Sequence, residues 1–313
     1  MIFNLRFLLL SLLLFNLYIY NEPVLIFTYA FNRPEFIELQ HKCFKKFLKD
    51  DYEFIVFNDA NTIENELAIE NTCKELGIKC VRIPQIIHDL PYLPRWDHEP
   101  SFHYPTIRCV NGVQFSLNRL GFFHKGPLLI LDSDMFLIRE FSVKEVLKNY
   151  DIISIYQRGI GDNNCTVNYI SIDLILMNME KLPNKQTFNV NCGYHDGAPT
   201  DAAGQTYWYI KNNPTIRILY SNNYVISEDN IIVDYFKNHA GHKIYSLNME
   251  NLKNAEFSEK EIEYIMSGAT NTEFVLNNCF HHYRSGSNWD GRPHEYHKNK
   301  FHLLKKFVEN ITQ

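Results

Sequence analysis

The stretch Leu128–Phe141, "LLILDSDMFLIREF", decides the fold of this chain. Its first four residues have the length and composition of a buried strand, and the apolar run breaks at Asp132 and Asp134 before it resumes at Met135. Residues i and i+2 of an extended chain share a face, so we expect the two carboxylates to point the same way. Such a pair at the end of a buried strand is costly unless a cation lies between its members.

The sequence around this stretch alternates short apolar strands with helical patterns, which predicts an α/β fold with a layered sheet. The near-continuous apolar run 23–31 is typical of a central strand. No repeat or low-complexity linker interrupts the chain, so residues 23–313 are expected to form a single compact domain. The expected strands are 23–31, 52–59, 78–84, 151–156, 169–178 and 273–283, and the expected helices are 34–48, 63–76 and 107–121.

Two further helix starts carry a complete local signature. Phe141-Ser142 with Glu145-Val146, and Phe257-Ser258 with Glu261-Ile262, each combine a capping box with a hydrophobic staple. The first of these helices would begin shortly after the aspartate pair. In open α/β sheets ligands bind outside the carboxyl ends of strands, so the pair is placed where a ligand site is expected.

Composition excludes some classes of function. The 313 residues carry a net charge of −5 and contain no dense Lys/Arg tract, so a nucleic-acid partner is not expected. The seven cysteines include no CxxC pair, which argues against a zinc ribbon. Cys73 and Cys80 are a possible disulfide if the compartment is oxidising, and the sequence does not decide this.

The N-terminal residues 1–20 include "RFLLLSLLLFNLYIY", one cation followed by an apolar run. No small-residue cleavage site follows, so we expect an uncleaved signal anchor and a single-pass type II membrane protein, luminal in the Golgi or ER if the source is eukaryotic. The apolar run is short for a membrane span, and a membrane-surface or core-packing helix is the alternative. The sequons at Asn164 and Asn310 fit a luminal domain but arise often by chance.

A divalent cation would satisfy the aspartate pair. Mg²⁺ and Mn²⁺ prefer oxygen ligands and take one or two carboxylates together with substrate phosphates. The alternative is that Asp132 and Asp134 cap the helix at Ser142 or solvate a turn.

Four segments together resemble the GT-A superfamily of nucleotide-sugar glycosyltransferases, and they cover roughly residues 24–289. They are "LIFTYAFNRPEFIEL" (25–39), "FIVFNDA" (54–60), the aspartate stretch itself and "FHHYRSGSNW" (280–289). The resemblance implies a Rossmann-type mixed sheet flanked by helices, with a D-x-D that holds a metal on the diphosphate of the donor. It also implies a late histidine as a further metal ligand. Adjacent strand residues face opposite ways, so only one of His281 and His282 should reach the metal, and we favour His282.

The resemblance also implies residues that contact the nucleotide. The first segment offers Thr28, Tyr29 and Arg33, and Asp59 ends the second strand where many members contact the base. Arg108 and Asn111 lie three apart, on one helical face, and are candidates for the ribose or phosphate, although a solvated polar face is equally expected.

One departure from the family pattern concerns the diphosphate. In members with a late His-x-x-Gly segment, a lysine precedes Pro-Trp and grips the diphosphate, whereas here Asn288 precedes Trp289. We expect Arg284 to take over that contact, because its guanidinium matches phosphate oxygens.

The function implied is metal-dependent transfer of a sugar from a nucleoside diphosphate, uridine by analogy, to a hydroxyl of a glycan, protein or lipid. Mn²⁺ or Mg²⁺ would be the cofactor. An inverting reaction needs a carboxylate as general base, and the candidates are Asp196, Asp201 and Asp229, each of which also has a structural reading. A retaining reaction would need none of them.

Three other classes of protein share part of this sequence pattern. A haloacid-dehalogenase-type phosphohydrolase also has a strand that ends in D-x-D, with the first aspartate as nucleophile. In those enzymes the motif sits in the first strand, whereas here it lies about 110 residues into the fold and Met135 follows. A nucleotidyltransferase would need a glycine-rich loop, which "TYAFNRPEF" lacks. A non-catalytic sugar-binding relative is disfavoured by the intact aspartates.

Overall fold

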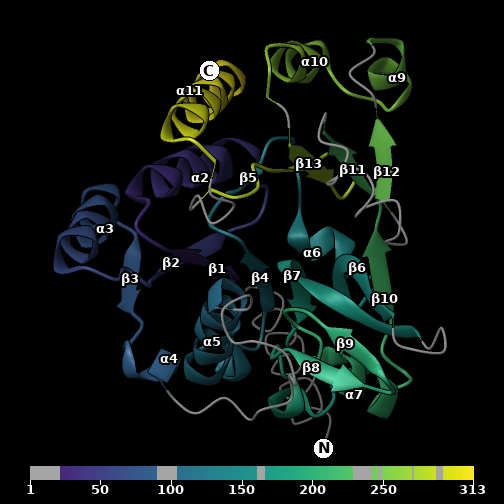
Figure 1. Cartoon of the computed structure of the whole chain (residues 1–313). Coiled ribbons are helices and arrows are strands. Elements are labelled where there is room, and N and C mark those ends of the chain that lie inside the picture. Colours follow the sequence, from purple (N-terminus) through teal and green to yellow (C-terminus); the bar gives the residue numbers. More distant parts are fainter. Residues whose placement is uncertain are drawn as a thin grey trace, which may run out of the picture.

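The computed structural model describes residues 22–89, 104–160, 166–227, 242–245, 249–269, 271–286 and 292–313. In this part of the chain the α/β prediction is confirmed: a seven-stranded mixed sheet, a five-stranded sheet and a two-stranded hairpin are flanked by helices (Figure 1). The main sheet has the spatial order β10 (Ile218–Ser221), β6 (Ile152–Ile160), β7 (Thr166–Asn178), β4 (Pro127–Leu131), β1 (Val24–Ala30), β2 (Tyr52–Asn58) and β3 (Lys79–Arg82).

The second sheet and the helices complete the architecture. The second sheet has the order β12 (His242–Tyr245), β11 (Asn223–Ile226), β13 (Thr272–Val275), β14 (Phe280–His282) and β5 (Met135–Leu137), and the hairpin pairs β8 (Gly193–His195) with β9 (Ala198–Thr200). The α-helices are α2 (Pro34–Phe47), α3 (Ile63–Leu76), α4 (Ile86–Asp89), α5 (Tyr104–Arg119), α6 (Val143–Val146), α7 (Thr206–Asn212), α9 (Met249–Asn254), α10 (Glu259–Met266) and α11 (His294–Thr312). In the described ranges, η1 (Gly121–Phe123) and η3 (Lys185–Thr187) are short 3-10 helices.

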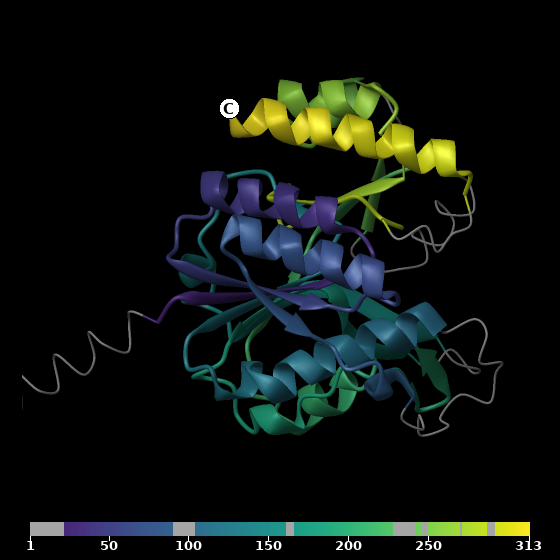
Figure 2. The ribbon, with the colours of Figure 1, turned by 90° about the vertical axis from the view of Figure 1, so that its left-hand side faces the viewer.

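The position of β1 in the sheet explains why its sequence is almost entirely apolar. It pairs in parallel with β2 on one side and β4 on the other. Val24 and Ile26 belong to the core that includes α2 and α3, while Leu25 and Phe27 belong to the core that includes α5. Figure 2 shows α2 and α3 above the sheet and α5 below it. Because both faces of the sheet are covered, strict alternation of polar and apolar residues is not needed.

The prediction of one strand over 273–283 was wrong, because the segment forms two strands. β13 and β14 pair antiparallel across a turn. Leu276, Asn277 and Asn278 have φ values of +54° to +61°, a left-handed conformation that an extended strand does not tolerate. The turn reverses the chain and brings β14 between β13 and β5.

The two helix starts differ in detail. The full capping box is present at Ser258, whose side chain accepts from the amide of Glu261 while the Glu261 side chain accepts from the amide of Ser258. At Ser142 the hydroxyl accepts from the amide of Glu145, and the amide of Val143 donates instead to Asp50, 2.6 Å away. A carboxylate from another loop thus caps part of this short helix.

The aspartate stretch is the link between the two sheets. The chain leaves the main sheet at the end of β4, turns through residues 132–134 and enters the second sheet as β5. Strand β14 pairs antiparallel with β5, and His282 lies opposite Met135 in the register. The fold therefore brings the late histidine segment to the two aspartates.

The remaining expectations concern thiols and the membrane. The thiols of Cys73 and Cys80 hydrogen-bond to one another and are not bridged. The expected signal anchor at residues 1–20 lies outside the described residues. Within the described ranges, no helix combines the length and the apolar character that crossing a bilayer requires.

Candidate functional site

Asp132, Asp134 and His282 converge into one cluster. The Nε2 atom of His282 lies 3.3 Å from Oδ1 of Asp134 and 3.9 Å from Oδ2 of Asp132. One ligand atom from each residue lies within 4.8 Å of the others. Neighbouring ligands of an octahedral ion with bonds of about 2.1 Å lie roughly 3 Å apart, so the three residues fit around one divalent cation after small adjustments.

The turn that carries the aspartates is held from several sides. The amide of Asp132 donates to the carbonyl of Asp173 at 3.0 Å. The buried amide group of Gln40, from α2, donates to the carbonyls of Asp132 and Met135 at 2.9 and 3.0 Å. The amide of Gly286 donates to Oδ2 of Asp134 at 2.8 Å, which leaves Oδ1 of that carboxylate facing His282.

The imidazole of His282 is oriented by a buried acid. Its Nδ1 lies 3.2 Å from Oε2 of Glu273, and Glu273 also accepts from Asn223 at 2.8 Å and from Arg284 at 3.2 Å. An anion at Nδ1 favours a proton there, so Nε2 is the nitrogen that faces the aspartates and would bind a metal once it gives up its own proton. Metal-bound histidines commonly donate their second nitrogen to a carboxylate in this way.

The charges of the cluster call for a cation. Burial, and then the carboxylates of Asp173 and Asp134, hold the pKa of Asp132 well above its usual range. Burial would also raise the pKa of Asp134, but His282 and the amide of Gly286 outweigh it and lower that pKa to about 2. Burial lowers the pKa of His282, yet Asp134 and Glu273 raise it well above its ordinary value. Protons thus stabilise the metal-free cluster in part, and a divalent ion would do so more fully.

Two acids of this site were missed in the sequence. Asp173 lies on β7 opposite the end of β4, since Leu131 pairs with Leu174 and Asp132 follows Leu131. Its signal was a single acid inside the apolar run "YISIDLILMN". Glu273 is 1% exposed in β13, and its only sequence signal was an acid at the start of an apolar strand.

His281 faces away from the cluster. Its side chain is fully buried, and Nε2 lies 2.8 Å from the hydroxyl of Thr272. The rings of Phe274 and Tyr264 lie 5.0 and 5.2 Å away. Burial, followed by the charges of Lys300 and His282, holds the pKa of His281 well below its ordinary value, as expected for a neutral core residue.

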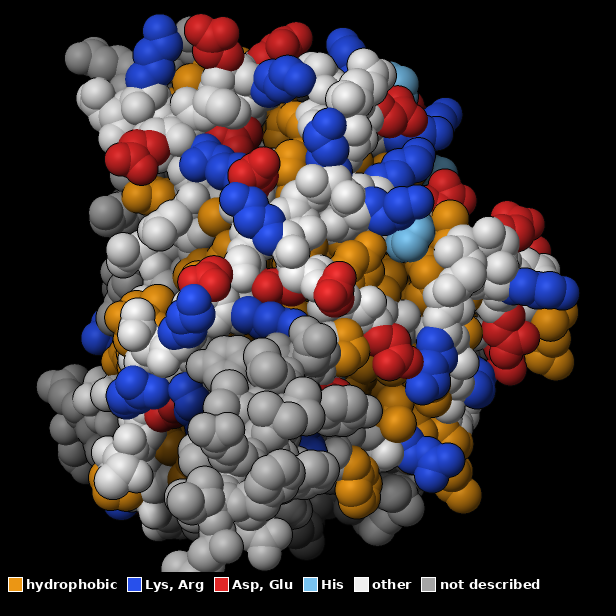
Figure 3. All heavy atoms as spheres, turned by 180° about the vertical axis from the view of Figure 1, so that it is seen from behind, with side chains coloured by type: hydrophobic (Ala, Val, Ile, Leu, Met, Phe, Trp, Pro, Cys, Tyr) orange, Lys and Arg blue, Asp and Glu red, His pale blue; other side chains and the backbone are white. Residues whose placement is uncertain are grey.

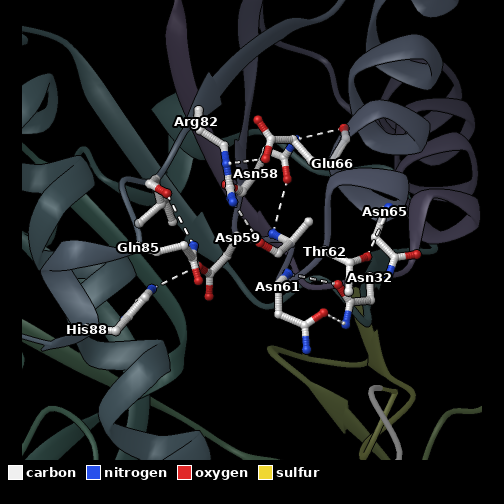
Figure 4. Close-up of polar contacts among 12 residues, drawn as sticks. Asn32, Asn58, Asp59, Asn61, Thr62, Asn65, Glu66, Arg82, Gln85 and His88 are labelled. Atoms are coloured by element: carbon white, nitrogen blue, oxygen red, sulfur yellow. Dashed lines mark hydrogen bonds and ion pairs between the residues drawn. The ribbon is translucent and has the colours of Figure 1, made fainter.

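The expected base contact Asp59 is engaged within the protein. The carboxylate, 5% exposed, pairs with Nε of Arg108 at 2.7 Å and with Nε2 of His88 at 2.8 Å. Gln85 lies against the same carboxylate, and Figure 4 shows Asp59, Gln85 and His88 converging from β2 and the segment around α4. Arg108, expected at the ribose or phosphate, thus serves here to neutralise Asp59, with its guanidinium 4.9 Å from the ring centroid of Phe31.

The other expected nucleotide contacts have internal partners or are buried. Thr28 is fully buried, and Tyr29 hydrogen-bonds to the hydroxyl of Ser116 at 2.6 Å. Arg33 donates to the carbonyl of Gly286 and pairs with Glu35. Asn111 makes a long bond to the carbonyl of Ile87 at 3.4 Å.

Of the three candidate bases, Asp229 lies outside the described residues. Asp196 is exposed at the β8–β9 turn, where it accepts from Tyr207 and lies 3.8 Å from Lys211. Asp201 is exposed, and its Oδ1 accepts from the amide of Ala202 at 2.8 Å. Burial, and then the charges of Asp132, Asp173, Asp201 and Asp59, hold the pKa of the Cys109 thiol well above its usual value.

Cationic side chains are not gathered on the face seen from behind. On the described part of that face, Lys and Arg side chains are interspersed with Asp and Glu side chains (Figure 3). This mixture is typical of a solvated surface, whereas a nucleic-acid site needs clustered cations.

No protein-family model matches the sequence, and no curated protein matches it. Solved structures do match. The WbbM bifunctional glycosyltransferase matches with 9% identity and a TM-score of 0.35, over 53% of this chain and 33% of that one. The galactosyltransferase LgtC, in complex with donor and acceptor sugar analogs, matches with 13% identity and a TM-score of 0.38, over 64% of this chain and 73% of that one.

A third match spans more of the chain. The mannosyltransferase PcManGT from Pyrobaculum calidifontis, in complex with GDP-Man and Mn²⁺, matches with 9% identity and a TM-score of 0.38, over 93% of this chain and 72% of that one. The match to WbbM, by contrast, covers only about a third of the length of that protein. All three TM-scores are below 0.5. The matched proteins are glycosyltransferases, the class that the motifs of this sequence resemble.

Proposed function

We propose that this chain is a metal-dependent glycosyltransferase that moves a sugar from a nucleoside-diphosphate sugar to a hydroxyl acceptor. The observation that carries the proposal is the convergence of Asp132 and Asp134 with His282, whose second nitrogen is held by Glu273. Such a site at the carboxyl end of a central strand is where an α/β sheet binds its ligands.

The ligand set favours Mn²⁺ over Mg²⁺. Two carboxylates supply the oxygen ligands that both ions accept, but Mg²⁺ is bound mainly through oxygen and retains its waters. The imidazole of His282 suits the softer transition ion better. When bound, the ion would stabilise the negative charge that develops on the leaving diphosphate.

The residues around the metal site have distinct proposed roles. We assign Arg284 the contact with a phosphate oxygen of the donor, because its half-buried guanidinium shares the carboxylate of Glu273 with His282. Asp201 is the favoured general base for an inverting reaction, because Asp196 is occupied by Tyr207 and Lys211. The donor base proposed is uridine, and the acceptor proposed is a hydroxyl on a glycan, protein or lipid.

The proposal is tested by screening nucleoside-diphosphate sugars for release of the nucleoside diphosphate with and without Mn²⁺. Wild-type protein should release the nucleoside diphosphate only with the metal, and Asp134→Ala should lose that release. Asp51→Ala is the matched control. Asp51 is exposed and directly precedes β2, so it lies at the amino ends of the parallel strands, whereas the aspartate pair follows the carboxyl end of β4. Activity that survives both a chelator and Asp134→Ala would refute a metal-dependent mechanism.

The phosphohydrolase alternative is less well supported by the site. Its nucleophilic aspartate must be free to attack phosphorus, but the carboxylate of Asp132 lies in a shared cluster with Asp134 and a carboxylate-backed imidazole. Hydrolysis of simple phosphate monoesters by the wild-type protein would favour this alternative.

Attachment to a membrane through residues 1–20 is also proposed, with the catalytic part on the luminal side if the cell is eukaryotic. It is supported only by the apolar sequence of that segment. Partition of the full chain with membranes, compared with a chain that starts at residue 22, tests it. Equal recovery of both in the soluble fraction would contradict it.

A further inference from the structure

The segment Tyr283–Gly286 joins β14 to the metal site and has little freedom. The amide of Tyr283 donates to the carbonyl of Asp134 at 2.8 Å, and the amide of Gly286 donates to the carboxylate of the same residue at 2.8 Å. A Cβ at position 286 would lie 2.7 Å from Cβ of Asp134 and 2.6 Å from Phe36. The backbone of this segment therefore lies directly against one of the two aspartates.

The same segment has a costly backbone conformation. Arg284 and Ser285 both have left-handed conformations, with φ values of +63° and +59°. Each such residue other than glycine costs roughly 1 kcal/mol or more, and the conformation persists only where its surroundings hold it. Something besides the amide of Gly286 must therefore fix the segment.

Arg33 holds the carbonyl of Gly286, and Glu273 holds the side chain of Arg284. Lys300 supplies the restraint on the carbonyls of Tyr283 and Arg284. It lies on α11, the long C-terminal helix, which crosses the molecule beside α2 (Figure 2), and it is only 3% exposed. Its ammonium donates to the carbonyls of Tyr283 and Asn271, the latter at 2.9 Å, and lies 3.4 Å from the carbonyl of Arg284. It also lies 4.2 Å from the ring centroid of Tyr283. The carbonyls of Tyr283 and Arg284 thus face Lys300 from the residue before the left-handed pair and from its first member.

A buried ammonium is costly, and a methionine or leucine would fill the same space without that cost. The carbonyls that surround Lys300 offset part of the cost only while they point inward. Turning the carbonyls of Tyr283 and Arg284 toward α11 directs the chain so that the amide of Gly286 reaches Asp134.

We propose that Lys300 is a positioning residue for the metal centre, which fixes the segment Tyr283–Gly286 and thereby the orientation of Asp134 and His282. The inference rests on the proposed metal site, but it assigns a role to a residue outside the group of three ligands, whose ammonium lies among backbone carbonyls. Helix α11 is then part of the functional unit, and its attachment sets the affinity for the metal.

The test is the affinity for Mn²⁺ alone, measured from the paramagnetic resonance signal of the free ion during titration. Lys300→Met keeps the apolar stem and removes the charge and the donors, and we expect it to weaken Mn²⁺ binding about tenfold or more. Lys185→Met is the matched control. Lys185 also donates to two backbone carbonyls, those of His124 at 3.0 Å and Met179 at 2.9 Å, and Met179 belongs to the core on the α5 face of the main sheet, whereas Leu304 of α11 belongs to the core on the other face. It should lose stability and keep wild-type affinity for Mn²⁺.

The outcomes distinguish failure of the proposed role of Lys300 from failure of the proposed metal site. A folded Lys300→Met protein with wild-type Mn²⁺ affinity would overturn the role of Lys300. Wild-type protein that fails to bind Mn²⁺ would refute the metal site instead. If Lys300→Met does not fold, Lys300→Gln, which keeps donors without the charge, is judged by the same criterion, and wild-type affinity there would equally overturn the role.

Discussion

The Nδ1 atom of His282 lies 3.2 Å from Oε2 of Glu273, a carboxylate whose side chain is 2% exposed. The two residues come from paired strands, β14 and β13, and are direct partners in the register. This pairing explains why an acid is tolerated in a buried strand, because Asn223 and Arg284 share the same carboxylate with the imidazole. It also makes the metal site depend on a residue that does not itself reach the metal.

Glu273→Gln should therefore weaken the metal site. The amide cannot accept from His282 and Arg284 as a charged group does, so the imidazole loses its fixed orientation. We expect Mn²⁺ affinity to fall about 10–100-fold. Glu261→Gln is the control, since Glu261 is also buried and pairs with Arg139. Metal titration of both variants checks this, and equal Mn²⁺ affinities for the two would contradict it.

His281 and His282 should respond in opposite ways to removal. His282→Ala should abolish measurable Mn²⁺ binding with a modest loss of stability. His281→Ala leaves a cavity among aromatic rings and should cost about 3 kcal/mol in the free energy of unfolding, while the folded fraction keeps its Mn²⁺ affinity. Urea unfolding and Mn²⁺ titration separate the two effects. Loss of Mn²⁺ binding in a folded His281→Ala protein would reverse the assignment.

Much of the main sheet was predictable because it depends on local patterns. The apolar runs of β1, β2 and β4 and the helix after Arg33 were read directly from hydrophobic periodicity, with ends displaced by a residue or two. The turn after β13 was not predicted, because no strong sequence signal marks three consecutive left-handed residues, one of which is Leu276. Asparagine at two of these positions was the one available hint.

The candidate site was predictable only where a motif carries it. Asp132 and Asp134 are recognisable in the sequence because they interrupt an apolar run. Glu273 and Asp173 do not, because their role follows from strand pairing across long sequence separations. The ion pair between Asp59 and Arg108 also has no sequence signal, because it joins the end of β2 to α5 across a long stretch of chain.

Asp173→Asn tests the like-charge strain at the end of β4. Asp173 lies across from Asp132, and carboxylates directly opposite each other in a sheet are destabilising. In a chelator the variant should therefore be more stable than wild type toward urea. Its Mn²⁺ affinity should fall about tenfold, because a charge roughly 6 Å from a divalent ion contributes about 1.4 kcal/mol even in water. A variant that is less stable without metal and unchanged in Mn²⁺ affinity would contradict both parts.

The ion pair of Asp151 with Arg217 should make the free energy of unfolding depend on pH, whether or not a metal is bound. The carboxylate of Asp151 accepts from the amide of Arg217 at 2.9 Å and from the guanidinium of the same residue at 3.1 Å. Burial raises the pKa of Asp151, but these hydrogen bonds and the charge of Arg217 outweigh it, so the pKa lies below its usual value. A depressed folded pKa means that the carboxylate stabilises the fold above the unfolded pKa of about 3.9, and that this contribution is lost as the pH falls through the folded value.

Asp151→Asn should accordingly be less stable than wild type by about 1 kcal/mol at pH 7, a modest value because the Arg217 side chain is 53% exposed. The difference should shrink as the pH falls below about 4, since wild type then loses the charge that the variant lacks. Urea unfolding of both proteins with a chelator present, from pH 7 down to pH 3, measures it. Glu145→Gln, in an exposed pair with Lys148, should show little difference at any pH. A gap between wild type and Asp151→Asn that stays constant with pH would mean that the ion pair with Arg217 does not stabilise this edge of the sheet.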